Sequence, residues 1–210
     1  MQVFDKTTQN DKPIFWKVED HHYLTLWDAK DLPNVNKWQE KIRQTHDEKL
    51  ITEFFDLMNR RWDDHKNLPI EPHQVSKVDD VLTFKGVAKF CRLITKQDST
   101  TFTHVAVGTA GDPTFVPFND ELQAEEDQVS FVTNGFFDAA GTSLRYGGTF
   151  DQSMPTETYS ESLVRNKALA SDSGMITMCL NAFGDDPINH TSGNTGFTAA
   201  GSIEFNVIMD

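Results

Sequence analysis

The feature that most constrains the fold is a series of short segments, in the second half of the chain, in which apolar and polar residues alternate. Alternation with a period of two is typical of strands that bury one face. Gly, Asn, Asp and Pro between such segments indicate tight turns. The strands expected from the alternation cover residues 102–107, 129–133, 176–180 and 203–207. The expected turns lie at 108–113, 134–135, 140–141, 147–148, 172–174 and 192–196. This pattern favours an antiparallel β-sandwich or a barrel-like β-domain.

A helical pattern precedes the strands and covers about residues 35–65. Its apolar residues recur at spacings of three, four and seven or eight, which is the period of one helix face. Asn34 or Asn36 can cap its start, and Pro69 closes the segment. Thr45 and His46 interrupt the stripe, so the helix breaks or exposes its face there. We expect the stripe to pack on the β-domain or on another subunit, because an isolated helix gains little stability without burial. The residues of this expected docking helix are Trp38, Ile42, Leu50, Phe54, Leu57, Met58 and Trp62.

Aromatic residues are dense in the first 30 positions, where residues 18–27 fit either a strand or a docking arm. The residues expected to form the arm are Phe15, Trp16, Tyr23 and Trp27. Residues 66–82 contain two prolines and several charges and are interpreted as a linker, followed by a short amphipathic helix near 87–94. The predicted fold is therefore α+β, with an N-terminal arm and a long helix before the β-domain. Residues 1–80 form the arm and helical docking region, and residues 81–210 form the assembly domain.

Composition excludes several classes of protein. Thirty-two acidic residues stand against 19 basic ones, a net charge of −13, and from Asp98 onward only Arg145, Arg165 and Lys167 are basic. Nucleic-acid binding is disfavoured, because it depends on Lys and Arg replacing counterions. No run approaches the roughly 20 apolar residues that span a bilayer, and the polar N-terminus lacks the apolar core of a signal peptide. We therefore expect a soluble chain that binds neither nucleic acid nor membrane.

Candidate chemistry is sparse. Two segments are considered for metal binding, residues 19–22 with His21 and His22, and residues 63–65 with two Asp and one His. Neither has the spacing of a metal site, so surface or packing roles are the simpler interpretation. Cys91 is expected to be buried on the apolar face of the short helix and Cys179 to pack within a strand, although a single bridge between them stays open. The acidic clusters at 120–121, 125–127 and 185–186 lack EF-hand spacing. We expect no catalytic residues, no cofactor and no metal, with structural Ca²⁺ as a minor alternative.

The order of the β segments resembles small virion proteins of tailed bacteriophages and archaeal tailed viruses, related to tail-collar fibre and neck or baseplate attachment modules. That family has a strand ending in a Gly loop, a Pro-containing loop leading to Leu and Glu, two further strands around a Gly turn, and a final amphipathic strand. The matching segments are 102–109, 113–122 with Glu125 or Glu126, 159–166, 174–183 and 201–209. Ser162 stands where the family usually has Gly, Val164 where an aromatic is common, and Asn181 where a basic residue is expected. The first 80 residues match no family pattern.

The resemblance implies a virion structural protein without enzymatic activity, at the neck or collar, the tail or baseplate, or the capsid surface. It implies other virion proteins as partners, and a homo-oligomer in the form of a ring, a trimer or a surface array. It also implies that the chain is made in the host cytoplasm and ends up in the virion.

An alternative of a different class is a β-sandwich module that binds a glycan or a receptor. Trp16, Trp27, Tyr146 and Phe150 are its candidate stacking platforms. Exposure of these rings on one surface would favour this alternative, and burial against the helix would favour assembly.

Overall fold

The computed structural model describes residues 2–9, 12–62, 70–79, 81–167 and 174–209. Its helices are α1 (Leu32–Thr45), α2 (Glu48–Trp62), α3 (Phe84–Ile94) and the single turn α4 (Phe131–Asn134). Its strands are β1 (Gln2–Gln9), β2 (Lys12–Asp28), β3 (Gln74–Val78), β4 (Val81–Leu82), β5 (His104–Gly108), β6 (Glu125–Ser130), β7 (Gly135–Ala140), β8 (Ser143–Phe150), β9 (Thr158–Tyr159), β10 (Glu161–Arg165), β11 (Thr177–Ala182), β12 (Ile188–Asn189) and β13 (Thr195–Met209). The predicted α+β class is confirmed.

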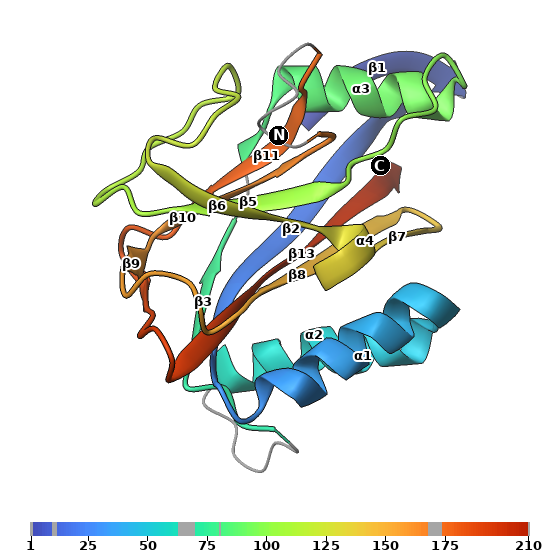
Figure 1. Cartoon of the computed structure of the whole chain (residues 1–210). Helices are drawn as coiled ribbons and strands as arrows, with labels where there is room; N and C mark the ends of the chain where they lie inside the picture. Colours follow the sequence, from blue (N-terminus) through green and yellow to red (C-terminus); the bar gives the residue numbers. More distant parts are fainter. Residues whose placement is uncertain (1, 10–11, 63–69, 80, 168–173, 210) are drawn as a thin grey trace.

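The strands form two main antiparallel sheets (Figure 1). The larger sheet has the order β1-β2-β13-β8-β7, and β3 pairs with β2 beyond the end of β1. The smaller sheet has the order β4-β11-β10-β5-β6, and β9 and β12 form a separate two-stranded ribbon. Neither main sheet closes into a barrel within the described parts of the chain.

One hydrophobic core fills the space between the two sheets. Leu24 and Leu26 of β2 and Tyr146 of β8 meet Val105 and Val107 of β5 in this core. The intervening residues of β2, including Tyr23 and Trp27, face the opposite side of the large sheet and belong to a second cluster. Both faces of the large sheet are thus buried.

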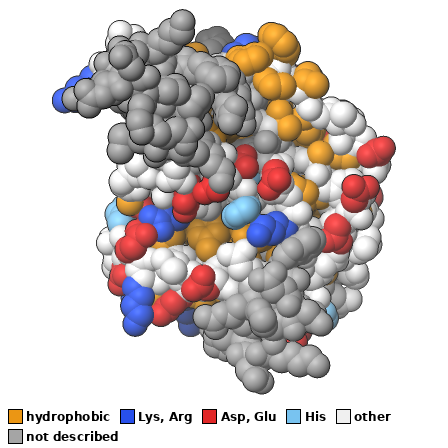
Figure 2. All heavy atoms as spheres, turned by 180° about the vertical axis from the view of Figure 1, so that it is seen from behind, with side chains coloured by type: hydrophobic (Ala, Val, Ile, Leu, Met, Phe, Trp, Pro, Cys, Tyr) orange, Lys and Arg blue, Asp and Glu red, His pale blue; other side chains and the backbone are white. Residues whose placement is uncertain are grey.

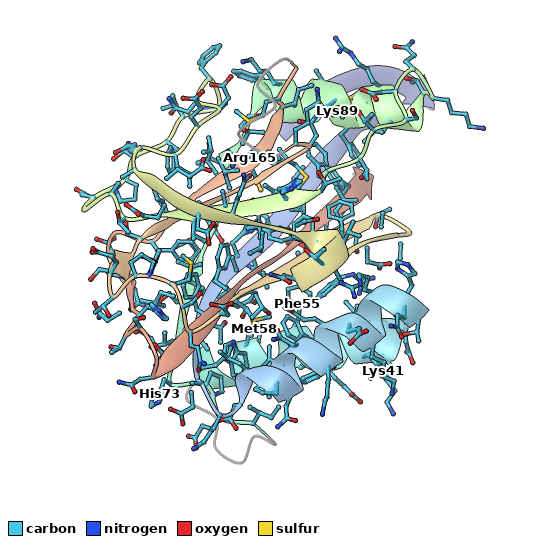
Figure 3. The ribbon with its side chains drawn as sticks, in the orientation of Figure 1. Lys41, Phe55, Met58, His73, Lys89 and Arg165 are labelled. Carbon is cyan, nitrogen blue, oxygen red and sulfur yellow. The ribbon has the colours of Figure 1, made fainter. Side chains whose placement is uncertain are left out.

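Helices α1 and α2 cover the outer face of the large sheet (Figure 1). The sequence predicted a single long helix, and this prediction is wrong. The segment forms two helices, α1 and α2, in a helical hairpin that turns at His46, where the backbone φ of 49° is left-handed. This is the position at which the apolar stripe is interrupted. Phe55 and Met58 lie between α2 and the sheet, whereas Lys41 points away from it (Figure 3).

The division of the chain at residue 80 does not separate two bodies. Strand β2 from the first region pairs with the whole of β13 from the second, from Ile14 opposite Met209 to Asp28 opposite Thr195. The expected arm is therefore a strand in the interior of the large sheet. The expected linker is also partly a strand, because β3 lies within it and extends the same sheet.

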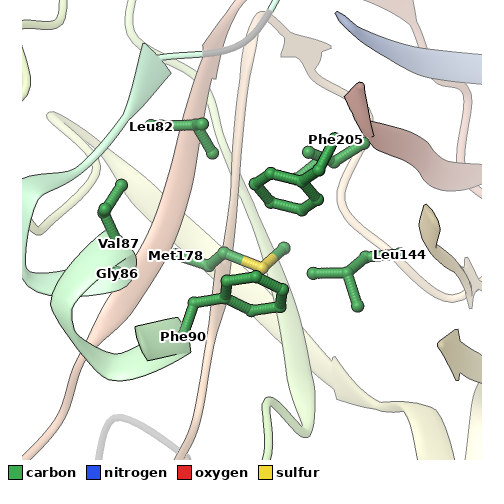
Figure 4. Close-up of a pocket in the computed structure, with 8 residues that line it drawn as sticks. Leu82, Gly86, Val87, Phe90, Leu144, Met178 and Phe205 are labelled. Atoms are coloured by element: carbon green, nitrogen blue, oxygen red, sulfur yellow. The ribbon is translucent and has the colours of Figure 1, made fainter. Parts of the chain in front are cut away.

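Helix α3 closes one open end between the sheets. Thr83 caps its first turn by accepting a hydrogen bond from the Gly86 backbone N–H at 2.8 Å. Phe90 stacks on Phe205 of β13, with ring centroids 4.7 Å apart. These rings and their apolar neighbours, including Met178, enclose a cavity of about 30 Å³ (Figure 4). A space of this size holds about one water molecule, so it is a packing gap beneath α3.

The loop over residues 109–124 covers the outer face of the small sheet. Leu122 and partly buried Phe115 pack there on Leu163 and Leu180. Glu161, whose side chain is fully buried, accepts hydrogen bonds from the backbone N–H groups of Gln123 and Ala124 at 3.0 and 2.7 Å. A buried carboxylate thus fixes the end of this loop.

Two local predictions were wrong. Gly147 and Gly148 were expected to form a turn but lie inside β8, where a side chain on Gly148 would collide with Val105 and Val129 of the facing sheet. The absence of side chains at Gly147 and Gly148 allows other residues to pack closely on both faces of β8. The strand expected at 129–133 ends at Ser130, whose hydroxyl accepts from the Val132 N–H and starts α4.

Candidate interaction surface

Large hydrophobic side chains are exposed at few of the described positions, and three of them lie together. Phe84, at the start of α3, is 43% exposed, and Val116 and Phe118, in the loop over the small sheet, are 51% and 80% exposed. The rings of Phe84 and Phe118 meet edge to face with centroids 4.8 Å apart. We refer to Phe84, Val116 and Phe118 as the apolar patch. Hydrophobic side chains also gather at the upper edge of the molecule when it is seen from behind (Figure 2).

Backbone hydrogen bonds hold the apolar patch in place. The Phe84 N–H donates to the Pro117 carbonyl at 3.0 Å and so joins α3 to the loop. The Val116 N–H donates to Asn119 Oδ1 at 2.7 Å, and the Asn119 N–H donates back to the Val116 carbonyl at 2.9 Å. The two exposed loop side chains therefore project from a closed turn, which lowers the entropy lost when a partner covers them.

Charged residues adjoin the apolar patch along the chain, with one more acidic than basic group among Lys85, Asp120 and Glu121. Lys85 forms an ion pair with Asp120, and Glu121 beside it is exposed. The nearby ion pair neutralises one acidic group, while the chain as a whole carries a net charge of −13. A partner with Lys or Arg around an apolar anchor would complement this surface.

Buried ion pairs also stabilise the small sheet and α3. Arg165, fully buried in β10, donates to both carboxylate oxygens of Glu125 at 2.8 and 2.5 Å and to Gln128 at 2.6 Å. Lys89 of α3 is 1% exposed and donates to Asp98 at 2.6 Å. The Lys89 hydrogen bond, together with bonds from Thr100, holds the pKa of Asp98 well below its usual range. Figure 3 places Arg165 and Lys89 on the side of the molecule where α3 and the small sheet lie.

The structure places the predicted docking residues in the protein's own interior. Ile42, Phe54 and Met58 have no exposed surface, and Leu57 is 2% exposed. Trp38 and Leu50 are half-buried against the same cluster. Tyr23 and Trp27 of the expected arm are buried there too. The side chains of Phe15, Trp16 and Trp62 lie outside the described residues. The stripe thus packs on the large sheet, one of the two packing modes that the sequence left open.

The candidate sugar-stacking rings are not on a surface. Trp27 has no exposed area, and Tyr146 and Phe150 are each 1% exposed. Trp27 donates from its indole N–H to Thr198 at 3.1 Å, and Phe150 stacks on Phe197. These three rings are core residues, so the stacking role assigned to them is wrong.

The groups considered for metal binding and nucleophilic chemistry are also separated. His22 is buried and hydrogen-bonded to the Tyr146 hydroxyl, and residues 63–65 lie outside the described parts of the chain. Within the described ranges, His, Cys, Asp and Glu form no group of three or more that could hold a metal ion. Cys91 is exposed, contrary to the prediction, because it lies on the solvent side of α3. Cys179 is buried in β11, and no disulfide joins it to Cys91.

Two departures from the virion-protein pattern are neighbours in the structure. Ser162 and Asn181 lie opposite each other on β10 and β11, and the Asn181 amide donates to the Ser162 hydroxyl at 3.0 Å. Both side chains are buried. Ser162 and Asn181 therefore form one hydrogen-bonded pair.

The chain matches no protein-family model, no curated protein and no solved structure. Among the helices that the structure describes, none has both the length and the apolar character needed to cross a membrane.

The apolar patch was not anticipated from the sequence, although a signal was present. The run Phe115-Val116-Pro117-Phe118 places three large apolar residues around a proline, within a stretch rich in acidic residues. Loops seldom need so many apolar residues for their own packing. Only Phe115 of this run packs on the core.

Proposed function

We propose that this protein is a structural part of a tailed-virus particle and that it acts through protein–protein contacts, without catalysis. In this proposal the two sheets form a sandwich-like body. The apolar patch is a contact surface at the neck or collar, the tail or baseplate, or the capsid surface. The chain is made in the host cytoplasm and retained in the virion.

The observation that carries the proposal is the exposed pair Phe84 and Phe118. Burial of the two rings in a contact removes apolar area from water at about 25 cal/mol per Å². Aromatic anchors of this kind often dominate the energy of protein contacts. Because hydrogen bonds fix the loop that carries Phe118, the exposed rings do not serve as a mobile cover for the protein's own core.

The arrangement of the segments that resemble virion proteins gives further support. Three of them, β11, β10 and β5, lie side by side in the small sheet, and a fourth is the loop 113–122 over the outer face of that sheet, followed by β6. The fifth is part of β13 in the facing sheet. The Leu and Glu of the pattern take specific roles. Leu122 packs on the outer face of the small sheet, and Glu125 accepts two hydrogen bonds from the buried Arg165 of β10. The segments that resemble virion proteins therefore include residues that anchor this loop on the small sheet.

We assign the apolar patch to a different virion protein and not to a symmetric contact with a second copy. A contact between two copies would bring together two chains that each carry a net charge of −13, and like charges at a contact cost stability. A partner surface with an apolar pocket and a rim of Lys or Arg avoids this cost. Rings, trimers or arrays of this chain would then use other surfaces, and light scattering coupled to size exclusion would measure them.

The experiment compares Phe118→Asp with Val132→Asp in virus particles. Val132 is 68% exposed on α4, so it is a matched exposed apolar residue away from the apolar patch. We expect Phe118→Asp to reduce incorporation of the chain into purified particles about tenfold or more, and Val132→Asp to leave it unchanged. Absence of the wild-type chain from purified particles would overturn the proposed function. Equal incorporation of both variants would overturn the role of the apolar patch.

A further inference from the structure

The large sheet ends at β7, and the backbone of this strand has a free edge (Figure 1). The Phe205 N–H of β13 donates to the carbonyl of Thr142, directly before β8, at 2.9 Å. Backbone groups in an antiparallel sheet alternate between the two neighbouring strands, so odd-numbered residues of β8 bond to even-numbered residues of β7. The N–H and carbonyl groups of Phe137 and Ala139 therefore point away from β8. They form no backbone hydrogen bond with the described residues on that side.

Strand β7 lacks the features that usually protect an outer strand from pairing with another chain. Outer strands of natural proteins are very short, carry charged side chains or proline, or are interrupted by bulges. Strand β4 has only two residues, and β6 begins with three acidic residues and pairs irregularly with β5. Strand β7 pairs with β8 without interruption and contains no Lys, Arg or Pro. Its single charged side chain, Asp138, is buried on the side of the helical hairpin, 3.0 Å from His46 Nδ1.

An apolar cleft of about 220 Å³ lies beside this edge, on the inner face of the large sheet. It is lined by Phe137 and Ala139 of β7, Leu144 of β8, and Phe90 and Leu93 of α3, and all but one of its lining residues are apolar. Ala139 is exposed and Phe137 is half-buried, so the described residues leave this part of the sheet uncovered. A cavity of roughly 150 Å³ admits benzene, and this cleft is therefore large enough for the side chain of a Leu, Met or Phe.

The edge and the cleft together favour an extended peptide as the occupant. The free backbone groups of Phe137 and Ala139 are two residues apart, a repeat of about 6.8 Å that an added strand matches with its own donors and acceptors. The side chains of the same two residues line the cleft. An added strand would thus direct alternate side chains toward the cleft while its backbone pairs with β7. A lipid or small apolar molecule would fill the cleft but leave the backbone groups without partners.

A second copy of this chain fits this edge less well than a different protein. On the inner face β7 offers one large apolar side chain, Phe137, and its ring already packs on Phe131 and Phe102, with centroids 5.7 and 6.4 Å apart. Each copy also carries a net charge of −13. The large side chain that enters the cleft must therefore come from another protein.

We propose that the edge of β7 binds an extended segment of a different virion protein as an additional strand, with one large apolar side chain of that segment inserted in the cleft. The inference rests on the proposed function, and the surface shares no residue with the apolar patch. The backbone hydrogen bonds provide affinity, and the cleft provides specificity for the inserted side chain.

Hydrogen exchange resolved to single residues tests the proposal on the full chain, free in solution and in purified particles. In the free chain the Phe137 and Ala139 amides should exchange fast, because they lack acceptors. In particles both should exchange at least about tenfold more slowly, since exchange then requires release of the added strand. The Asp138 amide, which bonds to β8, should be protected in both states and serves as the internal control.

Three outcomes of this measurement would overturn the proposal. Fast exchange of Phe137 and Ala139 in particles that contain the chain would refute the added strand alone. Protection in the free chain that increases with its concentration would identify a second copy as the occupant. Absence of the chain from particles would overturn the proposed function, and this inference with it.

Two variants at Ala139 test the edge and the cleft separately. Ala139→Pro removes the outward N–H at a position where an outer strand tolerates proline, and Ala139→Phe keeps the N–H but fills the cleft. Each should reduce incorporation into particles about tenfold. Ala139→Ser keeps the N–H and nearly the same volume, so it is the matched control and should incorporate like the wild type. If Ala139→Pro does not fold, equal incorporation of Ala139→Phe and Ala139→Ser would still refute the site.

Discussion

The outer faces of the two sheets are covered in different ways. The hairpin of α1 and α2 over the large sheet buries its apolar stripe almost completely, with Phe54 and Met58 fully inaccessible. The loop over the small sheet buries Leu122 but leaves Val116 and Phe118 in solvent. A regular helix presents its apolar residues on one stripe, which a single surface can cover. A loop has no such stripe, and the apolar residues that its own sheet does not need are left for another molecule.

The largest change in stability is expected when this contrast is tested with two Phe→Ala substitutions. Phe54 packs edge to face on Trp38 and Phe136, with centroids 5.5 and 5.7 Å apart. Phe54→Ala should lower the free energy of unfolding by about 3–5 kcal/mol, because it opens a cavity. Phe118→Ala should change it by less than about 0.5 kcal/mol. Urea denaturation measures both, and a comparable loss in Phe118→Ala would contradict the exposed position of that ring.

A second test releases the loop from its sheet. Glu161→Gln keeps the shape of the side chain but leaves one oxygen where two accept backbone hydrogen bonds. We expect a loss of about 2–3 kcal/mol, the contribution of a hydrogen bond to a charged group. Amide hydrogen exchange at Gln123 and Ala124 should accelerate. Glu121→Gln, in the same loop but exposed, serves as the control; if it has the same effect, Glu161 does not fix the loop.

The smallest expected effect concerns the turn of the helical hairpin and its dependence on pH. Glu48 accepts two hydrogen bonds from Arg145 of β8 at 2.6 and 2.7 Å, and these bonds lower the pKa of Glu48. A lowered pKa adds stability above the ordinary pKa of Glu. This stability is lost as the pH falls through the folded-state value. Since Glu48 is 64% exposed, the contribution is about 1 kcal/mol or less.

The measurement compares the wild type with Glu48→Gln. Their unfolding free energies should differ at pH 7 and converge in acid, below the folded-state pKa of Glu48. A constant difference across that range would show that the carboxylate charge has no role at the turn.

The sequence predicts features that depend on neighbouring residues better than those that depend on distant ones. The stripe of α2, the short helix α3 and the alternation in β11 and β13 are local, and these elements are present where expected. The turn at His46 was among the alternatives because the stripe is interrupted there. The pairing of β2 with β13 and the place of Gly147 inside β8 depend on residues far along the chain, which local patterns do not reveal.

The candidate surface was missed for the same reason. Phe118 is apolar in the sequence, and only the fold shows that its loop has no further apolar surface to cover. Gln39 lies on the buried face of α1, where a polar residue is unusual. Its place in the interior depends on Thr149, which donates a hydrogen bond to it, and on Gly147, which leaves room for it, both more than a hundred positions away.

The position of β2 between β1 and β13 has a consequence for synthesis. The hydrogen bond from Trp27 to Thr198 joins residues 171 positions apart. At about 5–20 residues per second, a ribosome needs roughly ten seconds or more to make the partner strand after β2 has emerged. During this time the edge of β2 and both of its apolar faces lack their final neighbours. The nascent chain must therefore be shielded from aggregation until β13 arrives, and early termination products should be substrates for chaperones and proteases.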